Sequence, residues 1–215
     1  MIEATYIDHM GSDLSVVNAA RVSFGKKHDT FQDKDKGLIR YLAKHKHISP
    51  FGHAFASFHV KAPIFVARQL VKHKFLRWNE ISRRYVDDEP EFYVPDVWRG
   101  RSADKKQGSD SNVVIDTAYY DRDDGYNTWD GDATDVSHEA YQKMIELGVA
   151  PEQARMVLPQ STLTEWYWSG SLDAFADMCR LRCASDTQYE SRVVADQISE
   201  KMSELFPVSW EALQS

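Results

Sequence analysis

The sequence predicts a single α+β domain in which helices flank a mixed or antiparallel sheet. An apolar alternation over residues 54–62 and an aromatic, β-branched run over residues 161–168 are typical of strands. Several other stretches have apolar residues at helical spacing. The chain has 215 residues, of which 42% are hydrophobic and 12% aromatic, enough for one sizeable core. Because no repeat or linker-like stretch divides it, we expect one domain over residues 1–215.

The first fifty residues contain one clear helical pattern. Residues 2–24 are interpreted as short apolar runs separated by turns, and residues 26–36 as a charged loop. Apolar side chains in the stretch 38–43 have the spacing of a helix. We expect this helix to end before Pro50, because the residue that precedes a proline avoids the helical region.

A strand and then a helix are predicted next. Apolar and polar residues alternate over 54–62, which indicates a strand buried on one face. Pro63 suits the first position of a helix, and the apolar stripe after it extends to about residue 74. Residues 75–85 are then predicted to form a loop.

The middle of the chain gives the weakest pattern. Residues 99–135 are polar and rich in Asp and Gly, which predicts a family-variable surface excursion with a short helix near residues 113–120. A helical pattern returns over residues 136–147, where Gly148 is a natural stop. Pro151 is expected to begin a further helix.

The last third of the chain combines a strand with two helices. The run over residues 161–168 predicts the strand. Ser171 is a candidate cap for a helix that extends to Arg182, and Asp186 is a candidate cap for a helix that extends to Leu205.

Composition excludes several classes of protein. Six Trp, ten Tyr and ten Phe are too many for a disordered chain. The apolar runs are far shorter than the roughly 20 residues of a membrane helix, and residues 1–10 lack the pattern of a signal peptide. The two cysteines, Cys179 and Cys183, cannot form a disulfide framework. We therefore expect no membrane partner and a cytoplasmic location, or the host cytoplasm if a phage encodes the protein.

Charge is unevenly distributed along the chain. The net charge is −7, yet residues 61–84 hold seven cations and one anion. A nucleic-acid surface is usually basic over a broad face, so this segment favours an anionic small molecule and no nucleic acid. A solvated cationic helix is the alternative. Five of the eight His lie between residues 45 and 73, but their spacing matches no standard ligand set, so we expect no metal.

The densest group of hydrogen-bonding side chains lies between residues 72 and 85. Ser82 follows the triplet Lys72-His73-Lys74 after an interval of seven residues. Cations suit a phosphate, while an amide and a carboxylate suit the edge of a planar polar ring. An exposed loop held by an Arg–Glu pair is the alternative. The other members of the group are Asn79, Glu80, Arg83, Arg84 and Tyr85.

This segment resembles the signature of the flavin-dependent thymidylate synthases: an Arg-His-Arg triplet, seven residues, Ser, and then x-Arg-Tyr. Further stretches are similar to the family in the same order, at residues 20–23, 47–69, 150–159 and 181–190. Lysines replace both arginines of the triplet, which keeps the charge but loses the planar fork of donors. Departures near the family's flavin site are Gly52, Ser171, Asp173 and Asp177.

The resemblance implies a homotetramer whose active sites are shared between subunits. It implies methylation of dUMP with methylenetetrahydrofolate as the carbon donor, reduced FAD as the hydride donor and NADPH as the reductant of the flavin. A flavin-dependent pyrimidine deoxynucleotide hydroxymethylase is one alternative. A nucleotide-binding homologue with impaired catalysis is another.

The resemblance also assigns residues to these ligands, position by position. Ser82 and Arg182 are expected to serve catalysis, and Arg182 suits a uracil carbonyl at which negative charge develops. Tyr85 is expected at the folate or flavin face. Neither cysteine has a neighbouring His that would make it a nucleophile. The expected dUMP set is Gln69, Glu80, Ser82, Arg83, Arg84, Arg155 and Arg182. The expected FAD set is Ser23, His47, Ser49, Lys72, His73, Lys74 and Asn79.

Overall fold

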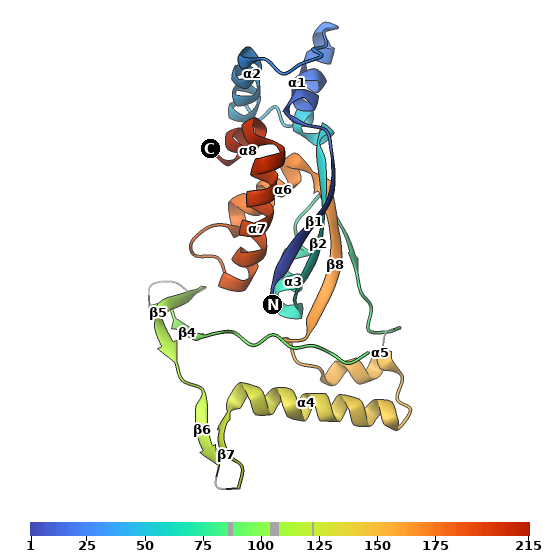
Figure 1. The fold of residues 1–215 in the computed structure, drawn as a ribbon, viewed down its shortest axis with the longest axis vertical. Helices are drawn as coiled ribbons and strands as arrows, with labels where there is room; N and C mark the ends of the chain where they lie inside the picture. The colour runs from blue at the N-terminus through green and yellow to red at the C-terminus, as the bar shows by residue number, and fades with distance from the viewer. Residues whose placement is uncertain (86–87, 104–107, 122) are drawn as a thin grey trace.

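Four antiparallel strands form the centre of the protein, in the order β1–β2–β8–β3 (Figure 1). This is the antiparallel form of the sheet that the sequence predicts. The computed structural model describes residues 1–85, 88–103, 108–121 and 123–215. The strands of the sheet are β1 (Glu3–Met10), β2 (Phe55–Pro63), β8 (Leu163–Ser171) and β3 (Leu76–Glu80).

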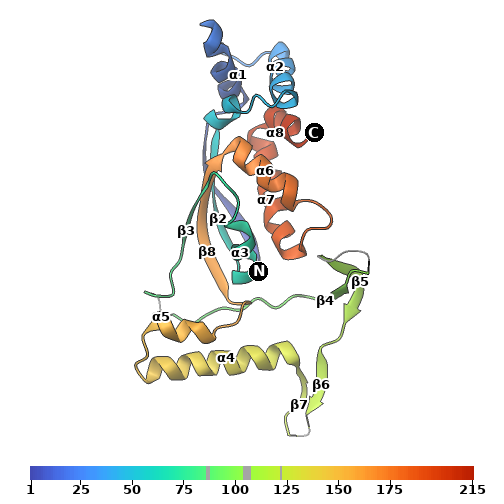
Figure 2. The same ribbon diagram turned by 180° about the vertical axis from the view of Figure 1, so that it is seen from behind.

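Helices α6 (Leu172–Arg182), α7 (Tyr189–Leu205) and α8 (Pro207–Gln214) pack on one face of the sheet (Figures 1 and 2). The alternation of β2 buries Phe58 on this face, where its ring meets that of Phe175 at 5.3 Å between centroids. Trp166 and Trp168 of β8 are buried beside it. Polar side chains of the same strands point to the opposite face, so the alternation of apolar residues determines which face the helices cover.

Two helices close one end of the sheet. They are α1 (Asp13–Arg21) and α2 (Asp33–Lys44), joined through the 3-10 turn η1 (Val22–Phe24), and η2 (Ser49–His53) follows α2. The expectation of short runs and turns over 2–24 is wrong, because a full strand and α1 occupy that stretch. α2 also begins inside the predicted charged loop 26–36, because the Asp35 side chain accepts the Gln32 amide at 3.0 Å and starts the helix.

Two hairpins and a long helix extend away from the sheet at its other end (Figure 1). Strand β4 (Trp98–Arg101) pairs with β5 (Ser109–Ile115), and β6 (Ala118–Asp121) pairs with β7 (Gly125–Thr128). The expected helix near 113–120 is therefore wrong. Residues 104–107 and 122 of the predicted excursion lie outside the described residues.

The helix after the hairpins begins earlier than its apolar pattern suggests. This helix is α4 (Trp129–Glu146), and the Thr128 hydroxyl caps it by accepting the Gly131 amide at 3.2 Å. The turn after it contains α5 (Pro151–Ala154) and η3 (Arg155–Val157). Pro151 thus begins a helix, as predicted.

The boundaries of the remaining strands and helices show where the local sequence was sufficient to predict them. β2 and β8 confirm the predicted strands, and α3 (Ile64–Leu70) begins directly after Pro63 but ends before residue 74. α6 follows Ser171 as expected, whereas Gln188 and not Asp186 precedes α7. α8 was not predicted. Among the described residues, none of the helices combines the length and apolar character that a membrane crossing requires.

The predicted loop 75–85 contains strand β3, which is a correction with consequences for the site. The backbone reverses at Phe75, which has a positive φ of 66°. The Trp78 ring then stacks on that of Trp166 at 4.3 Å between centroids, which holds β3 against β8. The partner strand lies far away in the sequence, so the local pattern gave no sign of it.

Candidate functional site

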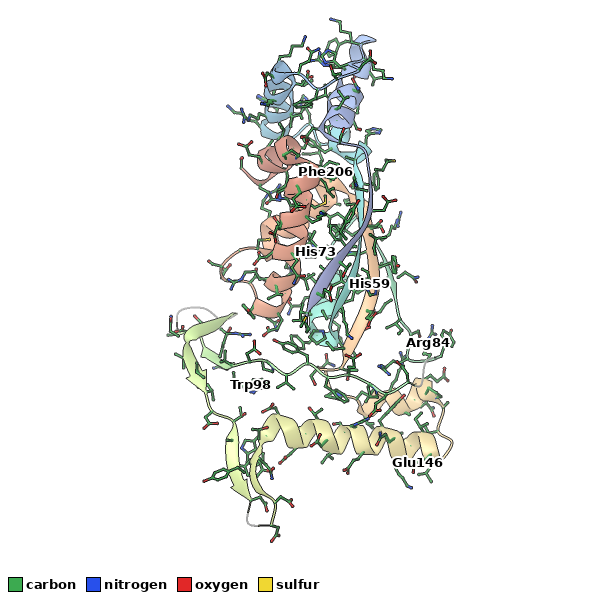
Figure 3. The ribbon with its side chains drawn as sticks, in the orientation of Figure 1. His59, His73, Arg84, Trp98, Glu146 and Phe206 are labelled. Carbon is green, nitrogen blue, oxygen red and sulfur yellow. The ribbon has the colours of Figure 1, made fainter. Side chains whose placement is uncertain are left out.

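Strand β3 divides the 72–85 segment into two halves. The triplet lies in the turn before the strand, and Ser82 to Tyr85 follow it. The strand spans about 14 Å, since a residue advances roughly 3.4 Å. Figure 3 shows His73 and Arg84 well apart from each other. One chain therefore does not bring all the predicted site residues together.

Gln69, His73 and Arg182 form one compact group. The Arg182 Nε–H donates to His73 Nε2 at 2.9 Å, and another guanidinium nitrogen donates to the backbone carbonyl of Gln69 at 3.5 Å. Burial and the Arg182 charge lower the pKa of His73 to about 4, so the ring is neutral at neutral pH. Because Nε2 accepts, the ring proton is on Nδ1. His73 was predicted to contact the flavin, but in the structure it contacts Arg182, which was predicted to bind dUMP.

A cavity of about 670 Å³ opens beside this group. Burial and the nearby Glu190 charge raise the pKa of Tyr93 to about 12, so its phenol stays protonated and can donate a hydrogen bond. The volume lies within the range of small-molecule sites, and the lining mixes aromatic and hydrogen-bonding side chains. Among the lining residues are Phe65, Gln69, Tyr93, Trp98, Arg182 and Glu190.

One charged contact at this cavity was not predicted from the sequence. Arg99 on β4 forms an ion pair with Glu190 at the start of α7 and lies over the Tyr189 ring at 4.6 Å. The Arg99 Nε–H also donates to the Ser109 hydroxyl at 3.0 Å. An arginine in an acidic, glycine-containing stretch was the only local signal, and it did not indicate a partner 91 residues away.

A second group lies at the far end of β3. The Glu80 carboxylate accepts the Thr164 hydroxyl at 2.7 Å and the Trp78 indole N–H at 3.0 Å, so the sheet holds it in place. The Ser82 hydroxyl accepts the Arg84 Nε–H at 3.2 Å. Arg83 instead donates to the backbone carbonyl of Asp88 at 3.0 Å, which directs this predicted dUMP residue into its own loop.

Exposed cationic and aromatic side chains complete the second group. The Arg84 guanidinium lies 5.0 Å from the centroid of the Tyr85 ring, and both side chains are exposed. Figures 1 and 2 place α5 beside the chain that leaves β3. Arg155 follows α5 directly, is exposed, and donates through Nε to the Glu152 carbonyl at 3.2 Å. Arg84 and Arg155 thus belong to the same end of the molecule.

The predicted flavin residues gather mainly at the opposite end of the sheet. Across the strands, Leu76 pairs with Gly170 and Gly170 with Ala56, so the turn holding Lys72 and Lys74 lies at the end of the sheet where η2 enters β2. His47, Ser49 and Ser23 are exposed at or near η1 and η2. Asn79 departs from the set, because it lies toward the other end of β3.

This end of the molecule also has free charge and a second cavity. The side chains of Lys72 and Lys74 are exposed, and neither forms a hydrogen bond or an ion pair with another described residue. A cavity of about 820 Å³ is lined by side chains that include Lys44, Lys46 and Asp173. One Asp173 carboxylate oxygen is buried without a described partner and lies 4.0 Å from where a Cβ on Gly52 would be. The cations Lys44 and Lys46 and the Asp173 carboxylate therefore line one cavity.

Cys179 is a poor candidate for a nucleophile in either group. Cys179 is buried, and its thiol donates to the Ala195 carbonyl at 3.6 Å. Burial, together with the neighbouring Cys183, raises the pKa of the Cys179 thiol well above its usual value. The thiolate that would attack an electrophile is disfavoured here.

Comparison with known proteins gives consistent relatives over almost the whole chain. The Thy1 family, described as thymidylate synthase complementing protein, matches residues 5–208. The flavin-dependent thymidylate synthase of Thermus thermophilus is 39% identical over 208 residues, which cover 97% of this chain and 74% of that protein. The enzyme of the same name from Kosmotoga olearia is 40% identical over 211 residues, covering 96% and 87%.

A solved structure has the same fold. The crystal structure of a UMP/dUMP methylase, PolB from Streptomyces cacaoi bound with 5-Br dUMP, has a TM-score of 0.81 and 33% sequence identity. The match covers 99% of this chain and 94% of that chain. Sequence and fold together show that the chain belongs to the Thy1 family of flavin-dependent thymidylate synthases.

Proposed function

We propose that the protein converts dUMP to dTMP, with methylenetetrahydrofolate as the carbon donor, FAD as the redox cofactor and NADPH as its reductant. The observation that carries the proposal is the Arg182–His73–Gln69 group at the edge of a cavity of about 670 Å³. The family membership supplies the reaction class. In the structure, Arg182 is held by hydrogen bonds and His73 is neutral, and both lie beside a cavity whose volume suits a nucleotide.

Arg182 is proposed to stabilise charge on the uracil carbonyl. Its guanidinium is held by His73 and by the Gln69 backbone, so little reorganisation is needed when negative charge develops on the substrate. Ser82 is proposed to position the nucleotide rather than to attack it, because no described base contacts its hydroxyl.

The 5′-phosphate is assigned to the exposed arginines at the other end of β3. Arg84 and Arg155 present planar donor groups that suit a phosphate. They lie on a different part of the molecule from Gln69 and Arg182, so a complete site needs a second copy of the chain. This arrangement supports active sites shared between subunits, in which one subunit supplies Arg182 and another supplies Arg84 and Arg155, and the resemblance to the family implies that the assembly is a homotetramer.

The residues around the α3–β3 turn fit FAD. Lys72 and Lys74 have free ammonium groups for a diphosphate, and the neutral His73 ring has an Nδ1–H to donate. Ser23, His47 and Ser49 would add hydrogen bonds from the same end of the sheet. When bound, FAD supplies the hydride that turns the transferred one-carbon group into a methyl group.

A second substrate is favoured by one comparison. The PolB structure is that of a methylase of both UMP and dUMP, and its complex with 5-Br UMP matches this chain with a TM-score of 0.77. UMP is therefore a candidate substrate alongside dUMP.

The test is to incubate the protein with FAD, NADPH, methylenetetrahydrofolate and either dUMP or UMP, and to determine the mass of the nucleotide product. We expect dTMP from dUMP. We expect Arg182→Ala to lower the rate by about 10²–10³-fold, as for loss of an oxyanion donor. Ser82→Ala should be slower but active, and the double variant Cys179→Ala/Cys183→Ala should stay active. A hydroxymethyl product would establish the alternative reaction, and a covalent adduct on Ser82 or a cysteine would contradict these roles.

A further inference from the structure

The hairpin β4–β5 is tied to the start of α7 through Arg99. The Arg99 and Glu190 side chains are 14% and 5% exposed, so their ion pair is largely removed from water. The guanidinium also lies over Tyr189 and donates to Ser109. A charge pair this buried is costly to break, because either partner alone would remain desolvated. The contact therefore fixes Glu190 in one position.

Glu190 in turn determines how the Gln188 side chain is oriented. The second carboxylate oxygen of Glu190 accepts the Gln188 amide at 3.3 Å. An ionised carboxylate only accepts hydrogen bonds, so Gln188 must direct its NH₂ group toward Glu190. The Gln188 carbonyl oxygen then faces the other way, toward Gln69.

The orientation of Gln188 determines that of Gln69. The Gln69 NH₂ group donates to the Gln188 carbonyl oxygen, and the Gln69 carbonyl oxygen accepts the Ser191 hydroxyl at 3.2 Å. Gln69 lines the cavity of about 670 Å³ beside Arg182. The polarity that Gln69 presents to a ligand is thus set by a chain of contacts that begins at Arg99.

We propose that Arg99 is a positioning residue for the nucleotide site, acting on the Gln69 amide through Glu190 and Gln188. The inference rests on the proposed function and adds a role for the excursion that carries β4. Arginine is required because its planar group contacts Glu190, Ser109 and the Tyr189 ring at the same time. A lysine would keep the charge but make fewer of these contacts.

The experiment measures dUMP binding to the FAD-loaded protein by titration calorimetry. We expect Arg99→Met to raise the dissociation constant about tenfold, because it removes one charge-assisted contact that orients Gln69. The dissociation constant of Arg99→Lys should lie between those of Arg99→Met and the wild type. Arg101→Met is the matched control, because Arg101 lies two residues along the same strand and is exposed. It should bind dUMP like the wild type.

A double-mutant cycle separates positioning from a general loss of structure. If Arg99 acts through Gln69, then Arg99→Met should change the dissociation constant of a Gln69→Ala protein by less than about twofold. A tenfold effect in that background would overturn the proposal. If Arg99→Met does not fold, judged by its circular-dichroism melting curve, then Glu190→Gln replaces it in the cycle with the same expected results.

The outcomes distinguish this inference from the proposed function. A wild-type protein that binds dUMP, with an Arg99→Met variant that binds equally well, overturns the inference alone. A wild-type protein that does not bind dUMP overturns the proposed function and the inference together.

Discussion

At the scale of single residues, His73 and Arg182 form a contact between two side chains that can both be cationic. Guanidinium groups only donate, so His73 accepts through Nε2 and is neutral. Burial and the Arg182 charge lower the pKa of His73 from 6.5 to about 4, and burial also lowers the pKa of Arg182. The pair leaves the Nδ1–H of His73 available as a donor.

This lowered pKa predicts an acid-sensitive contribution to stability. Between pH 6.5 and 4 the unfolded chain binds a proton at His73 that the folded chain does not, so the free energy of unfolding decreases as the pH falls through this window. Urea midpoints measured from pH 7.5 to 4 should therefore fall less in His73→Asn than in the wild type. His45→Asn, at an exposed histidine, is the control. Equal pH dependence in His73→Asn and the wild type would contradict the assignment.

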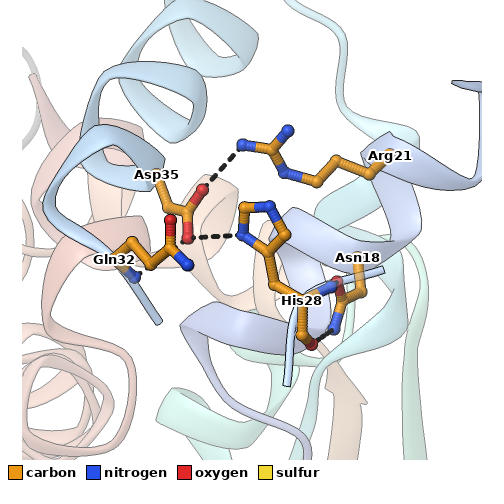
Figure 4. A network of polar contacts seen from close by, with 5 residues as sticks. All are labelled: Asn18, Arg21, His28, Gln32 and Asp35. Carbon is orange, nitrogen blue, oxygen red and sulfur yellow. Dashed lines mark hydrogen bonds and ion pairs between the residues drawn. The ribbon is translucent and has the colours of Figure 1, made fainter. Parts of the chain in front are cut away.

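At the scale of elements, one buried carboxylate joins α1 to α2. Asp35 is fully buried and accepts hydrogen bonds from Arg21 at 2.7 Å and from the Gln32 amide, with the His28 ring at 3.1 Å (Figure 4). Burial alone would raise the pKa of Asp35, but these contacts outweigh it and hold the pKa below its usual value. The carboxylate is thus the link between the two helices.

Replacing this carboxylate should loosen that end of the molecule. Asp35→Asn puts an NH₂ group among donors and removes the charge that pairs with Arg21, so we expect a loss of about 2–4 kcal/mol in the free energy of unfolding. Asp33→Asn is the control, since Asp33 lies on the same helix with a side chain that is 96% exposed. Urea denaturation measures both. Indistinguishable midpoints for the two variants would rule out the role given to Asp35.

At the scale of the whole molecule, the separation of Arg84 from Arg182 predicts complementation between inactive subunits. Arg84→Ala and Arg182→Ala chains, mixed and reassembled, should recover about a quarter of the wild-type activity by random pairing of the two contributions. A mixture of Arg84→Ala with Arg155→Ala should recover little, because both residues belong to the same end of one chain. If activity recovers only in the mixture of Arg84→Ala with Arg155→Ala, these residues have been assigned to the wrong subunits. Sedimentation of the mixtures tests for the tetramer.

The sequence by itself determined the features that depend on neighbouring residues. The alternation over 54–62 determined β2, because a strand with one buried face needs a period of two. Pro63 and Ser171 marked the starts of α3 and α6. The spacing of the triplet and Ser82 indicated the family, which the matches over the whole chain confirm.

Only the tertiary structure decided the features that depend on distant partners. β3 is a strand because Trp78 pairs with Trp168 on β8, and that strand separates the candidate site residues into two groups. From the sequence alone, Asp35 would be expected at the surface, and only the fold places Arg21 and His28 around it. The partner of Arg99 is Glu190, which lies 91 residues further along the chain. Local patterns report burial and turn preferences, whereas ion pairs and strand pairs form between segments that only folding brings into contact.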